Sequence, residues 1–556
     1  MKKKLKLLLA MLLCIVVTSG CGEVTMQEKT AELSIEDAKK ELDALLTRVN
    51  VTEVENPKLD IYTDDISETA ALADINTFDI VVQGNGAINI EIAAATELTS
   101  ESPDDWITVV AKNFNREDHK LNDKKVTVTV RQITSGEIMT YVNAGIYQPN
   151  AAIFSNDAWG KMVETSGIKT TQVCDRIAGN TAGILISKEA EAKVKETYKE
   201  VNFDTVIKAT QDGLIVFGYS NPYTSSTGLN GLTTMLKVFD PSNPLSDKAS
   251  NALLEYQKTS PPVAYTTAVL RNQAKKGIID AMVMEEQAYI NTPELSGYNY
   301  IPFGIRHDHP VYSFDWNTAD ENEAIQMFVD YCLSSQNQKL ATDKGFNRHD
   351  EYKSQDTGLT GQGYLTAQSM WKENKSGGRP VVTVFICDIS GSMRGEPLAS
   401  LQKSLIATLP YIGSEHYVGL ISYSDDVVVN LDIKQFDDKQ RAYFSGEVKN
   451  LTIGGSTHTY DAVLEGLSLI NKAQAEIPDA VPLIILLTDG ETTGGYTLSR
   501  ITSVVEGMRV PIYCISYNYS NDKNLETLSG INEASTIKAD SEDIVNQLRN
   551  LFTTQL

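Results

Sequence analysis

The chain has 556 residues, of which 42% are hydrophobic and 22% are charged. This composition is ordinary for a globular protein, and the length exceeds what one hydrophobic core organises, so we expect two or more domains. The formal net charge of -24 excludes a nucleic-acid partner, because phosphates are bound mainly by lysine and arginine. The same charge disfavours direct contact with anionic lipid headgroups, so attachment to a membrane requires an anchor.

The first 20 residues have the pattern of a bacterial export signal. Four lysines between residues 2 and 6 precede an apolar run over residues 7–17 that is too short to span a bilayer. The sequence Thr-Ser-Gly-Cys that follows ends at Cys21 and resembles the bacterial lipobox, although Thr18 stands where leucine is common. The resemblance implies that Cys21 is lipidated and that acyl chains tether the protein to the extracytoplasmic face of the cell membrane, at the cell surface.

Polar stretches divide the rest of the chain. Residues 21–77 are polar and acidic and are interpreted as a tether, which contains one capped helix beginning at Ser34. From residue 78 to residue 349, apolar runs alternate with helical patterns, which predicts βαβ units and an α/β domain. A second polar stretch with paired glycines, residues 350–378, is interpreted as a linker. A new α/β pattern then occupies residues 379–556.

The C-terminal domain shows the apolar runs of a buried parallel sheet. We expect strands over 381–387, 417–423, 482–488 and 510–517, with helices between them that include 460–470 and 498–508. This alternation predicts a doubly wound, Rossmann-like sheet, in which ligands bind at the carboxyl ends of the strands. Three oxygen-rich loops lie at that edge, residues 388–392, 454–460 and 489–490, so we expect them to converge.

The first of these loops carries the spacing of a metal site. Asp388, Ser390 and Ser392 alternate in a tight loop, so a carboxylate and two hydroxyls can face one hard cation. The pattern resembles the von Willebrand factor type A (VWA) family, whose metal-ion-dependent adhesion site (MIDAS) adds a threonine from a second loop and an aspartate from a third. The resemblance assigns these roles to Thr457 and Asp489 and implies bound Mg²⁺, with Mn²⁺ and Ca²⁺ as alternatives.

Two neighbours of Thr457 in the second loop are alternative candidates for the metal ligand. Thr459 competes for the threonine position because it lies two residues on, whereas the register to Ala462 favours Thr457. His458 is interpreted as a loop residue and not as a ligand. A cation held by two carboxylates and neutral hydroxyls stays electrophilic, so an open position can accept a carboxylate from a partner protein.

The N-terminal domain resembles the two-lobed bacterial extracellular solute-binding proteins, of the type 2 periplasmic-binding-protein fold. The segments that carry the resemblance are residues 126–137, 152–156 and 221–229. It implies a cleft between the lobes for a small solute, an oxyanion or similar, because helix N-termini attract anions. The hydroxyl residues expected to line this cleft are Ser135, Ser155, Ser225, Ser226 and Thr227. Each of them is alternatively only a helix N-cap, and Glu285 and Glu286 are interpreted as a solvated acidic turn.

No catalytic motif accompanies these sites. The sequence contains no phosphate-binding Walker loop, no HExxH motif and no GxSxG elbow, so we predict that the protein is not an enzyme. The predicted function is divalent-cation-dependent recognition or adhesion by a cell-surface lipoprotein that carries a solute-binding module. The alternative is a solute-binding receptor of an ABC-type transport system in which the VWA domain is an accessory.

Overall fold

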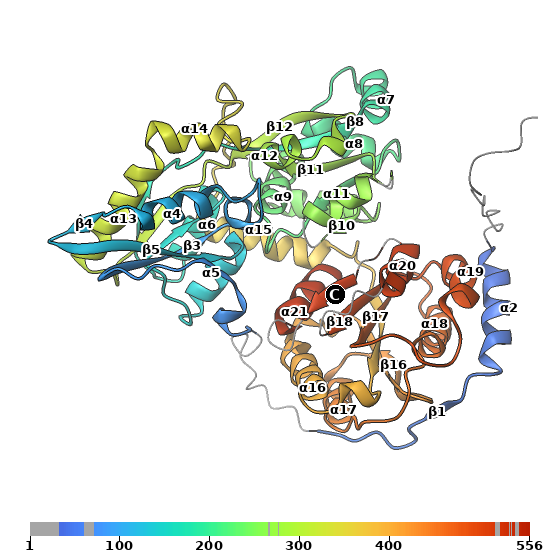
Figure 1. Cartoon of the computed structure of the whole chain (residues 1–556). Helices are drawn as coiled ribbons and strands as arrows, with labels where there is room; N and C mark the ends of the chain where they lie inside the picture. The colour runs from blue at the N-terminus through green and yellow to red at the C-terminus, as the bar shows by residue number, and fades with distance from the viewer. Residues whose placement is uncertain are drawn as a thin grey trace, which may run out of the picture.

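The computed structural model describes residues 33–60, 72–264, 267–275, 277, 279–517, 523–532, 534, 536–539 and 544–556. The predicted export signal and Cys21 lie outside these residues. Three β-sheets, each accompanied by helices, form the two lobes of an N-terminal domain and one C-terminal domain (Figure 1). The predicted α/β class is confirmed in both domains.

The C-terminal sheet has seven strands in the order β1-β16-β15-β14-β17-β18-β19. Its strands in the C-terminal region are β14 (Val381–Asp388), β15 (Tyr417–Tyr423), β16 (Val427–Gln435), β17 (Val481–Thr488), β18 (Ile512–Tyr517) and β19 (Thr536–Ala539). Strands β15, β14, β17, β18 and β19 are parallel to one another, whereas β16 is antiparallel to its neighbour β15. The four predicted strands are therefore present, each within two residues of its expected bounds.

Helices bury both faces of this sheet, which explains the continuous apolar runs. Alternate side chains of β14 enter two different cores, since Val384 packs with one set of helices and Phe385 with the other. The helices of this domain are α16 (Glu396–Thr408), α17 (Asp438–Lys449), α18 (Thr459–Glu476), α19 (Leu498–Met508), α20 (Lys523–Ile531) and α21 (Ile544–Gln555). Helices α18, α19 and α20 cover the face of Val384, and α16, α17 and α21 cover the face of Phe385.

Residues 33–60, which we expected to belong to a tether, are part of the C-terminal domain. Helix α2 (Ile35–Leu46) begins after its N-cap Ser34, as predicted, and buries Leu42 against α18 and α19. Strand β1 (Val51–Glu53) then adds to the sheet edge parallel to β16. Apolar residues recur at helical spacing along α2 and form one face of the helix. In a solvated tether this face would stay exposed to water, so it needs a surface to pack against.

The first lobe of the N-terminal domain is built on a sheet with the order β2-β5-β3-β6-β13-β7, to which β4 adds beside β5. Its strands are β2 (Ile80–Val82), β3 (Ile88–Ala94), β4 (Lys120–Leu121), β5 (Lys124–Gln132), β6 (Ala151–Ile153), β7 (Thr170–Cys174) and β13 (Val311–Phe314). Its helices are α3 (Thr96–Thr99), α4 (Trp106–Arg116), α5 (Ser135–Asn143), α6 (Asp157–Glu164), α13 (Ala319–Cys332) and α14 (Ser335–Asp343). The helices after β3 and β5 cross over between parallel strands, as the βαβ pattern predicted.

The second lobe has a five-stranded sheet with the order β10-β9-β11-β8-β12. Its strands are β8 (Thr181–Ser187), β9 (Phe217–Ser220), β10 (Val263–Ala264), β11 (Ala281–Glu285) and β12 (Tyr298–Arg306). Its helices are α7 (Lys188–Tyr198), α8 (Phe203–Gln211), α9 (Ser226–Phe239), α10 (Asp247–Gln257), α11 (Thr267–Lys275) and α12 (Glu286–Ile290). The chain enters this lobe after β7 and returns to the first lobe before β13, so two crossings join the lobes.

The stretch 350–378, expected to be a linker, contains a buried helix of the N-terminal domain. Helix α15 (Gly361–Asn374) packs against α6 of the first lobe and against α9 and α10 of the second. Its Trp371 is fully buried and donates a hydrogen bond of 2.8 Å from Nε1 to the hydroxyl of Tyr219. Burial of this aromatic side chain stabilises the helix, and α15 packs against both lobes.

Within the described ranges, no helix is long and apolar enough to cross a membrane.

Candidate functional site

The three oxygen-rich loops of the C-terminal domain meet at the carboxyl edge of its sheet. The amide of Gly391 donates to the carbonyl of Gly455 over 2.9 Å, which joins the first loop to the second. The hydroxyl of Ser392 donates to Oδ1 of Asp489 over 2.7 Å, which joins the first loop to the third. The convergence expected from the sheet topology is therefore present.

Asp388 ends strand β14 and is fully buried at the base of this cluster. Its Oδ1 accepts the amide of Ser390 at 2.8 Å, and its Oδ2 accepts the hydroxyl of Thr488 at 2.6 Å. Burial raises the pKa of Asp388, and the charge of Asp489 adds to this, although the bonds from Ser390 and Thr488 oppose it. No lysine or arginine among the described residues forms an ion pair with Asp388 or Asp489, so neutral donors alone surround the buried carboxylate.

The opposite side of the cluster is open to solvent. The hydroxyls of Ser390 and Ser392 lie 3.1 Å apart, and Ser392 is exposed whereas Ser390 is buried. Two carboxylates and these hydroxyls make a set of hard oxygen donors, which suits Mg²⁺ or a similar cation. In the part of the chain that the structure describes, no three His, Cys, Asp or Glu side chains could hold a metal, so this site differs from carboxylate-rich metal centres.

The second loop contributes its two threonines differently. The backbone amide of Thr457 donates to the hydroxyl of Thr493 over 2.9 Å, and Thr457 is almost fully buried. Thr459 begins helix α18, and its Oγ1 lies 3.4 Å from the hydroxyl of Tyr423, which also lies 3.2 Å from Oδ2 of Asp388. Thr459 therefore belongs to the buried network behind Asp388, which leaves Thr457 as the candidate ligand.

His458, between these threonines, faces a different residue. Its Nδ1 lies 3.6 Å from Oδ2 of Asp461, one turn into helix α18. This position agrees with the interpretation of His458 as a loop residue.

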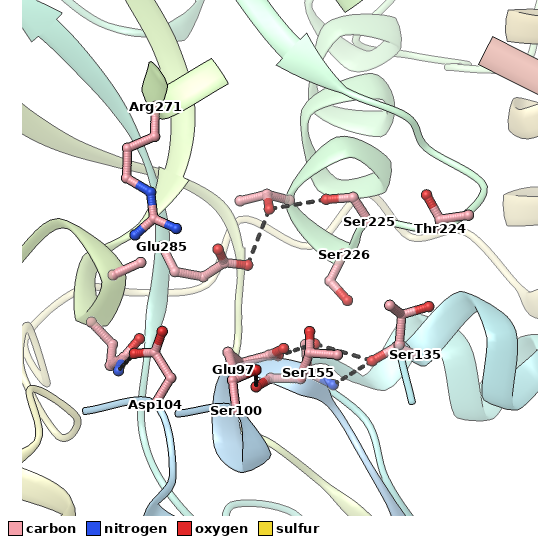
Figure 2. A pocket seen from close by; sticks show the side chains of 15 residues that line it. Glu97, Ser100, Asp104, Ser135, Ser155, Thr224, Ser225, Ser226, Arg271 and Glu285 are labelled. Carbon is pink, nitrogen blue, oxygen red and sulfur yellow. Dashed lines mark hydrogen bonds between the residues drawn. The ribbon is translucent and has the colours of Figure 1, made fainter. Parts of the chain in front are cut away.

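A second site lies between the lobes of the N-terminal domain. All five predicted hydroxyl residues line one cavity of about 260 Å³. Figure 2 shows Ser135 and Ser155 on the wall formed by the first lobe and Ser225 and Ser226 on the opposite wall. The five residues that the resemblance to solute-binding proteins assigned to one cleft therefore line the same cavity, although they are up to 92 positions apart, from Ser135 to Thr227.

The hydrogen bonds of these residues decide between lining and capping roles. Ser225 is the N-cap of α9 and accepts the amide of Gly228, so it caps a helix and lines the cavity at once. Ser135 is not a cap, because Thr134 caps α5, and its hydroxyl lies 3.0 Å from that of Ser155. Trp159 of the first lobe donates to the hydroxyl of Ser226 in the second lobe over 2.8 Å, which ties the two walls together.

The acidic pair Glu285–Glu286 is not a solvated turn. Both residues are more than nine-tenths buried, and Glu285, at the end of β11, lines the cavity with Glu97 and Asp104. Sequence reasoning missed Glu97 and Asp104, together with Gln287 and Arg271 of the same lining. Glu97 follows strand β3 by three residues, so a carboxylate just beyond a strand end was the available signal.

Comparison with known proteins matches one family to each domain. Residues 96–347 match the bacterial extracellular solute-binding proteins, and residues 383–552 match the von Willebrand factor type A domain. The chain therefore combines an N-terminal bacterial solute-binding-protein domain with a C-terminal VWA domain.

Individual relatives are distant. The inter-alpha-trypsin inhibitor heavy chain H1 of Sus scrofa is 26% identical over 206 residues, which cover 34% of this chain and 21% of that protein. The chain thus spans about a fifth of the length of this relative. Iron-bound HitA from Pseudomonas aeruginosa is 12% identical with a TM-score of 0.38, over 52% of this chain and 99% of that one. A von Willebrand factor type A structure from Catenulispora acidiphila is 16% identical with a TM-score of 0.28, over 32% of this chain and 42% of that one.

Proposed function

We propose that this protein is an extracytoplasmic binding protein whose VWA domain recognises a protein ligand through a divalent cation. Asp388, Ser390, Ser392, Thr457 and Asp489 would hold the cation, with Mg²⁺ the first candidate. The observation that carries the proposal is the buried carboxylate of Asp388, which has no basic partner among the described residues and lies beneath a solvent-open set of hydroxyls and Asp489. A cation bound there replaces the missing basic partner of Asp388.

Binding of a protein ligand suits this set of oxygen donors better than catalysis does. With two carboxylates and otherwise neutral hydroxyls as ligands, a bound divalent cation stays electrophilic, so an open coordination position can take a carboxylate oxygen from a partner protein. Its charge also offsets the repulsion between an acidic ligand and a chain of net charge -24. Solute-binding and VWA domains are typically non-catalytic, which supports the same reading.

A capture experiment tests this proposal. Immobilised wild-type protein and its Asp388→Ala variant are incubated with extracytoplasmic and surface proteins of the source cell, in Mg²⁺ or in EDTA. We expect a ligand that binds wild type in Mg²⁺ and is lost both in EDTA and with the variant. Capture of the same proteins by the Asp388→Ala variant, or equally in EDTA, would contradict the proposal.

The proposed location follows from the solute-binding domain and from Cys21. Extracellular solute-binding domains work outside the cytoplasmic membrane, and the lipobox-like sequence ending at Cys21 would attach the chain to that membrane by acyl chains. Both binding sites would then face the cell exterior.

The interlobe cavity supports a second candidate function. A cavity of about 260 Å³, lined from both lobes by nine serine and threonine residues, suits a small polar solute. The protein would then act as the receptor of an ABC-type transport system, with the VWA domain as an accessory. Loss of uptake of the bound solute in a strain lacking the protein supports this candidate, and unchanged uptake counts against it.

A further inference from the structure

The charges that line the interlobe cavity are mainly negative. Glu97 and Asp104 come from the first lobe and Glu285 from the second, whereas Arg271 is the only basic side chain among the described lining residues. Figure 2 shows Glu97 and Glu285 on opposite walls and Asp104 below Arg271. This excess of carboxylates is the reverse of what an oxyanion site requires.

Each of the two glutamates is held in place by one hydroxyl of the cavity lining and by one histidine outside the lining. The carboxylate of Glu97 accepts the hydroxyl of Ser155 and lies 3.4 Å from Nε2 of His309. Burial raises the pKa of Glu97, but the imidazole of His309 and the Ser155 hydroxyl outweigh it, and the pKa lies below its ordinary value. Glu97 is therefore an ionised carboxylate inside a buried wall.

Glu285 is fixed in a similar way from the other lobe. Its Oε1 accepts the hydroxyl of Thr227 at 3.0 Å and lies 3.3 Å from Nδ1 of His307. Thr227 lies in the first turn of α9, so the negative charge of Glu285 already stands at the N-terminus of this helix. An incoming anion would have to displace or approach this carboxylate.

Gln287 supplies an acceptor that has no partner. Its Nε2 donates to Oδ1 of Asp104 over 2.6 Å and lies 3.5 Å from the carbonyl of Lys344, and both neighbours are acceptors. The amide orientation is thus settled, and Oε1 of this fully buried side chain has no hydrogen-bond donor among the described residues. A buried acceptor without a hydrogen bond is unfavourable, and a ligand with N–H or O–H groups supplies the missing bond.

Asp104 shows the mutual repulsion of the lining carboxylates. Burial raises the pKa of Asp104, and the charges of Glu97 and Glu285 raise it further against the opposing effects of Gln287 and Arg271. A positive group between the walls relieves this repulsion. Arg271 does so only in part, because it is one basic side chain against three lining carboxylates.

The chemistry of the lining also separates kinds of cation. No three His, Cys, Asp or Glu side chains in the described ranges are close enough to hold a metal ion, so the lining is not a carboxylate-rich metal centre. A quaternary ammonium is recognised by aromatic faces, and none of the described lining residues is aromatic. Carboxylates, an amide oxygen and hydroxyls instead match a group with several N–H donors.

We propose that the interlobe cavity binds a small organic cation with a primary ammonium group, placed between Glu97, Asp104 and Glu285 and donating to Oε1 of Gln287. The inference rests on the proposed solute-binding role of the N-terminal domain and names the class of solute. The nine hydroxyl residues of the lining then pair the remaining polar groups of the solute.

Calorimetry on the purified full-length chain tests this assignment. The probes are putrescine, ethanolamine and L-lysine, with choline as the quaternary ammonium and sulfate and molybdate as the oxyanions. We expect at least one primary amine to bind and to raise the melting temperature, and choline, sulfate and molybdate not to bind. Asp104→Asn and Glu285→Gln each remove a charge but keep the side-chain shape, so each should weaken amine binding at least tenfold.

The matched control is Glu323→Gln, which removes an exposed carboxylate of α13 on the same domain. It should leave amine affinity unchanged, and the melting temperatures of all ligand-free variants report whether they fold. Binding of sulfate or molybdate without any amine would overturn the inference but keep the solute-binding role. Equal binding of choline would overturn the requirement for N–H donors, and binding of none of the probes would count against both proposals.

Discussion

Arg549 of the C-terminal helix α21 forms a buried ion pair with Glu137 of helix α5 in the solute-binding domain. Nη2 of Arg549 donates to both carboxylate oxygens, at 2.6 and 2.5 Å, and the two side chains are only 6% and 4% exposed. Helix α21 packs on α16, which follows the loop of Asp388, Ser390 and Ser392 (the DxSxS loop), and α5 begins at Ser135 of the interlobe cavity. The ion pair therefore joins the structural elements that carry the two proposed sites.

Removing one partner of this ion pair should strongly destabilise the chain. Although burial opposes its charge, Glu137 holds the pKa of Arg549 above its ordinary value. Glu137→Gln leaves the guanidinium buried without a counter-charge, which costs about 3–5 kcal/mol in comparable pairs. Chemical denaturation measures this loss.

A double-mutant cycle and a matched pair complete the ion-pair test. Adding Arg549→Met to Glu137→Gln should restore part of the lost stability, because no unpaired charge then stays buried. Asp204→Asn, which breaks the exposed pair with Lys208, should cost less than about 1 kcal/mol. If Glu137→Gln is as stable as Asp204→Asn, the two domains are not joined by this contact.

Leu42→Ala tests whether residues 33–60 belong to the VWA domain. Leu42 is buried between α2 and the C-terminal core, so its truncation should lower the free energy of unfolding by about 2–5 kcal/mol. Glu36→Ala, an exposed change on the same helix, should have little effect. A solvated tether would make the two variants equally stable in a thermal melt.

Glu465 predicts a pH dependence of stability. Burial raises the pKa of Glu465 in α18 to about 7 from an unperturbed 4.5; nearby Glu53 of β1 and Asp432 of β16 raise it too, while Lys472 opposes them. Because the folded-state pKa is the higher one, the native chain binds more protons than the unfolded chain between about pH 4.5 and 7. This contribution to stability is complete below pH 4.5 and is lost as the pH rises through 7.

Glu465→Gln should therefore raise the melting temperature at pH 8 and change it little at pH 4.5. The control is Glu476→Gln, which alters an exposed residue at the end of the same helix and should leave the pH profile unchanged. An unaltered profile for Glu465→Gln would show that Glu465 ionises normally in the folded chain.

Cys21→Ala tests the proposed lipid anchor, which lies outside the described residues. Without the thiol there is no site for the acyl chains, so the protein should move from the membrane fraction to the soluble fraction. Persistence of the variant in the membrane fraction would mean that another segment anchors the chain. Immunoblotting of the two fractions decides the matter.

Sequence patterns predicted those helices and strands whose buried residues follow one another closely along the chain. The apolar run over 381–387 predicted β14, because a strand covered on both faces must be apolar throughout. The spacing of Asp388, Ser390 and Ser392 in the loop after it predicted a cation site. Strand β1, by contrast, has only three residues and exists through pairing with β16, which lies more than 370 positions further on. Such pairing leaves no local signal.

The same limit applies to the second site. Ser225 and its neighbours could be predicted because they begin a helix, and a helix start has its own sequence pattern. Glu97, Asp104 and Gln287 meet only when the lobes are assembled, since the bond from Gln287 to Asp104 crosses between them. The acidic lining, and with it the class of solute, thus depended on the tertiary structure.

The central claim, that the DxSxS loop holds a divalent cation, is tested most directly by thermal melts in EDTA and in increasing Mg²⁺ or Mn²⁺. A ligand that binds only the folded state stabilises it, so the wild-type melting temperature should rise with the cation and then level off. Asp388→Ala and Asp489→Asn should abolish the rise, and Asp479→Ala, an exposed change before β17, should keep it. An equal rise in the Asp388→Ala variant would contradict the claim.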